Sequence, residues 1–156
     1  MQTRRGAIQA YLAGEGRDGR GRTAREVVAL PDRDLEASHD WVQWLFPLPT
    51  RSAAVPGAPV LDPVETAAIR ADPRSRATLE QAAERMAAFY ARTPFWLTAF
   101  DHNHLRITRI LQSLRLLLGP EAARRFYETI MRLHEAGGAP VNPDSLRYWR
   151  NAVDGR

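Results

Sequence analysis

The chain has 156 residues, of which 44% are hydrophobic and 26% charged, and it contains no cysteine. The size and composition are those of a globular protein with one core, and the absence of cysteine excludes disulfides, thiolate zinc sites and cysteine nucleophiles. No stretch approaches the ~18 consecutive apolar residues of a membrane span, and the N-terminus lacks the apolar core of a secretory signal, so we expect a cytoplasmic location.

The positive charge of the chain is concentrated near its N-terminus. All 22 basic residues are arginine, as expected for a GC-rich genome, and the net charge is +4. Residues 1–25 hold six arginines and two acidic residues, whereas residues 26–156 hold 16 of each. We therefore expect a basic, Gly/Arg-rich and partly mobile arm at residues 1–22, with little contribution to the core, and a helical domain at residues 23–156 that is neutral from Glu26 onward. Nucleic acid is not an expected partner, except weakly and at low salt through this arm.

Short elements are predicted in the first part of the chain. Residues 8–12 have the composition of a short helix, and the Gly/Arg/Asp stretch at residues 14–22 is typical of a flexible linker. Thr23 and Glu26 have the capping-box spacing that begins a helix, and Pro31 ends that helix.

A dense aromatic segment follows. Its apolar residues have helical spacing, which predicts a helix from Asp32 or Asp34 to Phe46, and Pro47 stops this helix. The loop at residues 50–61 is rich in Ser, Ala and Pro. Its apolar residues favour a position against the core rather than in solvent.

Four later helices begin where proline follows a capping residue or a glycine: Asp62-Pro63, Asp72-Pro73, Gly119-Pro120 and Asn142-Pro143. A second aromatic cluster, residues 95–100, forms a turn before one further helix, residues 104–118. Leu111 and Leu114 are expected to be almost fully buried on that helix, and Leu105 adds apolar surface to its opposite side. The last helix carries the apolar residues Leu146, Tyr148, Trp149 and Val153.

No segment alternates between apolar and polar residues with a period of two, so the predicted fold class is all-α. We expect a single compact multi-helix domain in which the helix at residues 104–118 is central and buried.

Three of the four histidines lie in two polar clusters, His39-Asp40 and Asp101-His102-Asn103-His104. A metal-dependent hydrolase or other small-molecule enzyme would need at least three of four groups to converge: His39, Asp40, His102 and His104. The competing interpretation is structural, with Asp101 and Asn103 capping the next helix and a neutral histidine bonded to backbone. His134 stands at a helix end, where a cation is favourable. No cofactor is expected.

Aromatic and arginine side chains dominate protein recognition sites, which makes Trp41, Trp44, Trp96 and Arg109 candidates for a binding groove. The alternative is that these tryptophans belong to the core. Arg106 and Arg109 flank the inward face of the central helix, where arginines pair with carboxylates or meet an anionic ligand.

Three segments resemble the N-terminal conserved domain of the opioid growth factor receptor family. They are Leu35-Glu36 with His39-Asp40-Trp41-Val42-Gln43-Trp44-Leu45-Phe46-Pro47-Leu48, the run Asn103 to Leu116, and Ser145-Leu146-Arg147 with Trp149-Arg150. The resemblance covers residues 21–153 and identifies the chain as a short member of bacterial type. It departs from the family pattern at Val55, where an asparagine is usual.

The resemblance implies an all-helical, non-enzymatic domain that binds a peptide or protein segment; vertebrate members are nuclear-associated and bind a small opioid peptide. The candidate ligand-binding residues are then His39, Trp41, Trp44, Trp96, His102, Asn103, His104, Arg106 and Arg109. The resemblance does not identify the ligand of this chain or its oligomeric state.

Overall fold

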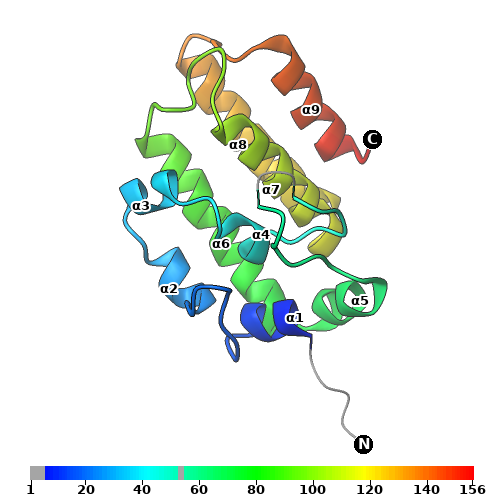
Figure 1. Ribbon diagram of the computed structural model, residues 1–156. Coiled ribbons are helices and arrows are strands. Elements are labelled where there is room, and N and C mark those ends of the chain that lie inside the picture. Colours follow the sequence, from blue (N-terminus) through cyan, green and yellow to red (C-terminus); the bar gives the residue numbers. More distant parts are fainter. Residues whose placement is uncertain (1–5, 53–54) are drawn as a thin grey trace, which may run out of the picture. The chain divides into compact units, whose positions relative to one another are not determined.

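The computed structural model describes residues 6–52 and 55–156, and over these residues it has nine helices and no strand (Figure 1). The all-α prediction is therefore confirmed. The helices are α1 (Ala7–Leu12), α2 (Ala24–Val28), α3 (Asp32–Ala37), α4 (Val42–Leu45), α5 (Pro63–Ala71), α6 (Pro73–Arg92), α7 (Asn103–Leu117), α8 (Pro120–Ala136) and α9 (Pro143–Asp154). Within the described ranges, no helix is both long and apolar enough to cross a membrane.

The chain forms two compact units, Met1–Ala82 and Ala83–Arg156, and α6 contributes residues to both. In the first unit α1 packs against α4 and α5. In the second unit α7 packs against both α8 and α9, which also contact each other.

The predicted helix starts are confirmed wherever the signal is local. The Thr23 hydroxyl accepts the Glu26 N–H, and the Glu26 carboxylate accepts the Thr23 N–H, which completes a capping box at α2. Asp62 caps α5 and Asn142 caps α9, each with a side-chain oxygen that accepts a backbone N–H of the first turn. Proline occupies the first turn of both helices, where its missing N–H costs nothing.

The aromatic segment is not one helix, contrary to the prediction. Helix α3 ends at Ala37, Ser38 is extended with ψ of 139°, and α4 begins only at Val42. The break lets the indole Nε1 of Trp41 donate to the carbonyl of Leu35 at 3.1 Å. The break also accompanies ion pairs of Asp40 with Arg20 and Arg22, distant partners that helical spacing does not take into account.

The expectation of an N-terminal arm that adds little to the core is wrong for residues 7–13. Tyr11 and Leu12 have no exposed surface, and Ile8 is 2% exposed. The carbonyl of Leu12 accepts a 2.6 Å hydrogen bond from the Thr78 hydroxyl. Sequence distance hid this contact, because the partner lies 66 residues away. Residues 1–5 of the predicted arm lie outside the described residues.

The loop at residues 50–61 is only partly against the core. Leu61 is 3% exposed and donates its N–H to the carbonyl of Leu48, whereas Val60 is 40% exposed. Residues 53 and 54 of this loop lie outside the described residues.

Helix α7 buries Leu111 and Leu114 completely, as predicted. Leu105 is 72% exposed at the start of α7, so the apolar surface that it adds to the opposite side of the helix faces solvent. Tyr148 is 49% exposed on α9, which turns Trp149, Ala152 and Val153 inward.

Candidate functional site

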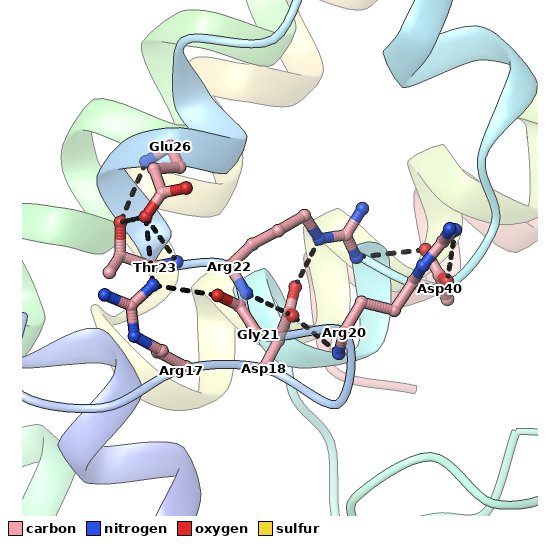
Figure 2. A network of polar contacts seen from close by, with 8 residues as sticks. All are labelled: Arg17, Asp18, Arg20, Gly21, Arg22, Thr23, Glu26 and Asp40. Carbon is pink, nitrogen blue, oxygen red and sulfur yellow. Dashed lines mark hydrogen bonds and ion pairs between the residues drawn. The ribbon is translucent and has the colours of Figure 1, made fainter.

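A network of charged groups closes the loop between α1 and α2 (Figure 2). The side chain of Asp18 has no exposed surface. One of its carboxylate oxygens accepts the N–H groups of Arg20 and Arg22 at 2.9 and 3.0 Å, and the other accepts Arg22 Nε at 2.8 Å. A buried carboxylate with three donors is well satisfied, so Asp18 fixes the course of this glycine-rich loop.

The same arginines extend the network to Asp40. Arg22 donates to one oxygen of Asp40 at 3.0 Å and Arg20 to the other at 3.1 Å. Burial by itself would raise the pKa of Asp40, but the hydrogen bonds and charges of Arg22 and Arg20 outweigh burial and lower it. Both oxygens of Asp40 therefore already have cationic partners, and its neighbour His39 is an exposed residue.

The positive charge of the N-terminal arm is balanced within its own unit. Arg17 bonds to Glu26 at 3.2 Å, so three arginines of the predicted arm have acidic partners within the first unit. That unit holds 11 arginines and 11 acidic residues, whereas Ala83–Arg156 holds 11 arginines and seven acidic residues. The net charge of +4 thus belongs to the second unit.

The tryptophans proposed for a groove are mostly core residues. Trp41 and Trp96 have no exposed surface, and neither does Trp149. Trp44 is half-buried and meets Tyr11 edge to face, with ring centroids 5.5 Å apart. Burial, assisted by the charge of Asp18, raises the pKa of Tyr11.

Trp96, His104 and Trp149 form a bonded cluster in the core of the second unit. The indole of Trp96 donates to the carbonyl of Tyr90 at 3.0 Å, and the indole of Trp149 donates to the carbonyl of His104 at 3.0 Å. The ring Nε2 of His104 bonds to the carbonyl of Trp96 at 2.8 Å. Since a carbonyl only accepts, this nitrogen carries a proton, and it is not a free metal ligand.

In the polar cluster before α7, Asp101 accepts an N–H of the first turn, as the structural interpretation expects, whereas Asn103 is itself the first residue of the helix. One oxygen of Asp101 accepts the N–H of Asn103 at 3.0 Å and its side-chain amide at 2.8 Å. The amide oxygen of Asn103 accepts the hydroxyl of Tyr90 at 3.2 Å. Asn103 is fully buried, while the side chain of His102 is 42% exposed. His102 and His104 therefore point to different environments.

The arginines of α7 are packed rather than splayed into solvent. Arg106 is 6% exposed. Burial lowers the pKa of Arg109 to about 10. Arg115 donates to the carbonyl of Val153 at 3.1 Å, which joins α7 to the end of α9.

Of the four large hydrophobic side chains that are exposed in the described part of the second unit, all but Tyr148 lie in one stretch of sequence. Phe95 is 50% exposed, Phe100 is 79% exposed and Leu105 is 72% exposed. We call residues 94–105, which link α6 to α7 and include the first residues of α7, the exposed apolar turn. Composition showed this aromatic cluster, but its outward orientation depends on Trp96 taking the core position.

His134 is a further polar residue whose role was misread from sequence. It is 2% exposed, and burial lowers its pKa by more than the charge of Glu135 raises it, while His104 adds a smaller lowering effect. It is therefore a neutral core residue at neutral pH rather than a cation at a helix end. Its ring meets Trp149 edge to face, with centroids 6.4 Å apart.

Comparison of the chain with family models, with curated proteins and with solved structures finds no significant match.

Proposed function

We propose that this protein is a non-enzymatic binding domain, and that the exposed apolar turn recognises a peptide or protein segment. One observation carries the proposal: three large apolar side chains within 11 residues are at least half exposed. Clustered apolar groups in water are costly, and in soluble proteins they mark interaction surfaces.

The turn is held rigidly from beneath, which favours binding. Trp96 anchors its start through the bond to Tyr90, and Asn103 anchors its end through the bonds to Asp101 and Tyr90. A surface that is ordered before its partner arrives loses less conformational entropy on binding. Phe100 is then presented between two fixed points.

The positive charge of the second unit favours an acidic peptide as the ligand of the exposed apolar turn. The second unit carries the whole net charge of +4, and the arginines on α9 beyond the turn, Arg147 and Arg150, are exposed. An acidic partner is attracted to such a surface over a Debye length of about 8 Å at physiological salt, while apolar side chains supply most of the affinity. The proposed ligand is therefore a segment with apolar and acidic residues.

The resemblance to the opioid growth factor receptor family is consistent with peptide binding and stays a proposal. Its quoted residues are mainly core residues here, such as Trp41, His104 and Trp149, so it bears on fold more than on ligand choice. For an enkephalin-type pentapeptide, followed by tryptophan fluorescence, we expect weak or no binding.

The test is a selection of random dodecamer peptides on the immobilised full chain, followed by calorimetry with the synthetic peptides recovered. Enriched peptides are expected to bind a Phe100→Ala, Leu105→Ala double variant at least about tenfold more weakly, which equals about 1.4 kcal/mol. Val64→Ala is the matched control, since Val64 is 75% exposed but lies on α5. Failure to enrich any peptide, or equal binding to the double variant, would overturn the proposal.

A further inference from the structure

The connection between α8 and α9, residues 137–142, supports the exposed apolar turn from one side (Figure 1). The backbone N–H and the side-chain amide of Asn142 both donate to the carbonyl of Ala99, at 3.2 and 2.6 Å. A Cβ added to Gly137 would lie 2.9 Å from the Cδ1 of Leu97, so Leu97 already packs closely on that glycine. The connection therefore supports the middle of the turn, between the anchors at Trp96 and Asn103.

His134 holds this connection in shape with two bonds. Its ring Nε2 accepts the N–H of Val141 at 3.1 Å, and its backbone carbonyl accepts the N–H of Ala139 at 2.9 Å. Gly138 and Ala139 both have positive φ, 89° and 52°. This backbone is unfavourable for alanine, and it persists where surrounding contacts hold it. The ring bond to Val141 is one of those contacts.

That bond exists in only one protonation state of the ring. Because the N–H of Val141 can only donate, Nε2 must be unprotonated, and the proton of the neutral ring is on Nδ1. Among the described residues, Nδ1 of His134 is a buried atom without a hydrogen-bond partner. A second proton would make Nε2 a donor that faces the donor of Val141, inside the core.

The surroundings of His134 disfavour its charged form. Burial is the main cause of its lowered pKa, and His104, from α7, adds to it. Glu135, on the same helix, opposes them. From α9 the ring meets Trp149, which does not titrate. Protonation therefore occurs below the ordinary range of histidine, where it breaks the bond.

His104 does not share this property. Its Nε2 donates to the carbonyl of Trp96, and it remains a donor when the ring gains a second proton. The anchor beneath the start of the turn is thus insensitive to protonation of His104, and the sensitive contact is that of His134 with Val141.

We infer that protonation of His134 releases the connection at residues 137–142 and, with it, the exposed apolar turn, so that binding at the turn weakens in mild acid. This inference rests on the proposed function for its consequence in binding. Its structural half, the release of the connection and the turn when His134 is protonated, concerns the protein without any ligand.

The structural half is tested by NMR on the full chain, without any ligand, from pH 8 to pH 4.5. The imidazole signals of His134 and the amide signals of Val141 and Phe100 are expected to shift with one common midpoint below pH 6.5, the ordinary midpoint of histidine. Amide exchange at Val141 is expected to accelerate at least tenfold across this midpoint, after correction for intrinsic rates. A Phe100 signal that does not follow His134 would overturn the inference.

Two variants show which histidine is responsible. His134→Gln offers an amide oxygen to Val141 and does not titrate, so the shift at Phe100 should disappear. His102→Gln removes the exposed histidine of the turn and should leave that shift unchanged. Should His134→Gln not fold, the shared midpoint in the wild-type protein still decides. A shift at Phe100 that persists in His134→Gln or vanishes in His102→Gln would contradict the inference.

A binding measurement separates this inference from the proposed function. The dodecamer peptides selected above are titrated at pH 7.5 and pH 5, and a loss of affinity of at least about fivefold in wild type, absent in His134→Gln, is expected. If Phe100→Ala weakens binding but pH does not, the proposed function stands and the inference falls. If the NMR titration succeeds and Phe100→Ala has no effect, the proposed function falls.

Discussion

The carboxylate of Glu65 accepts the backbone N–H of Gln9 at 2.9 Å, so an acidic residue of α5 satisfies a free donor in the first turn of α1. The interaction does for α1 what a capping side chain does for other helices, and its negative charge suits a helix N-terminus. A Cβ added to Gly6 would overlap the carboxyl group of Glu65, so a larger residue there would make this carboxylate move.

Gly6→Ala should therefore displace Glu65 and destabilise the first unit by about 1 kcal/mol, the usual cost of losing a helix cap. Urea unfolding measures the change. Gly57→Ala is the matched control, because a Cβ there meets no atom within 4 Å. Equal stability of the two variants would show that Glu65 does not hold α1.

The N-terminal segment should be essential to the stability of the first unit. Leu12→Ala removes a side chain with no exposed surface and is expected to cost about 2–5 kcal/mol. Deleting residues up to 22 should lower the melting temperature strongly. Arg17→Ala is the control, since its ion pair with Glu26 is exposed and should contribute less than about 1 kcal/mol. A deletion that leaves the melting temperature unchanged would contradict this prediction and show that the N-terminal arm is dispensable for folding.

Two leucines of α7, six positions apart, should differ in how much stability is lost when each is replaced by alanine, because only one of them is buried. Leu111→Ala is expected to destabilise by about 2–5 kcal/mol because Leu111 has no exposed surface. Leu105→Ala should change the free energy of unfolding by no more than about 0.5 kcal/mol, because Leu105 is 72% exposed. Chemical denaturation of both variants checks this, and a cost at Leu105 similar to that at Leu111 would refute its outward orientation.

The ion pairs of Asp40 should contribute stability that depends on pH. The pKa of Asp40 is lowered in the folded protein, so its contribution is complete above the unfolded value of about 4 and is lost as the pH falls toward the folded value. Asp40→Asn should therefore cost about 1 kcal/mol at pH 7, with the difference shrinking below about pH 4.

Urea titrations of wild type and Asp40→Asn at pH 7, 4 and 2.5 measure this dependence. Asp144→Asn is the control, since Asp144 pairs with Arg147 at an exposed site, 69% exposed for the acid. A difference between wild type and Asp40→Asn that stays constant over this range would mean that the network of Figure 2 does not stabilise the fold.

Sequence predicted those features whose cause is local. The starts of α2, α5 and α9 depend on residues within three positions of each other, such as Thr23 with Glu26 and Asn142 with Ser145. The burial of Leu111 and Leu114 follows from the helical spacing of apolar residues along one 15-residue helix.

The features that sequence missed depend on partners far along the chain. The break before α4 accompanies bonds between Asp40 and arginines 18 and 20 positions earlier. The burial of α1 depends on Glu65 and Thr78, more than 50 positions away. For the candidate site, composition indicates the aromatic cluster at residues 95–100 but favours Trp96 rather than Phe100 as a binding residue. Composition cannot tell which side of a turn faces the core.

The central claim is that the exposed apolar turn is a preformed binding surface, and NMR shift mapping with a selected dodecamer peptide tests it most directly. We predict that the largest amide shifts fall on Phe95, Phe100 and Leu105, while residues buried beneath the turn, such as Trp96, move little. The largest shifts elsewhere in the chain, or none at any residue, would contradict the account.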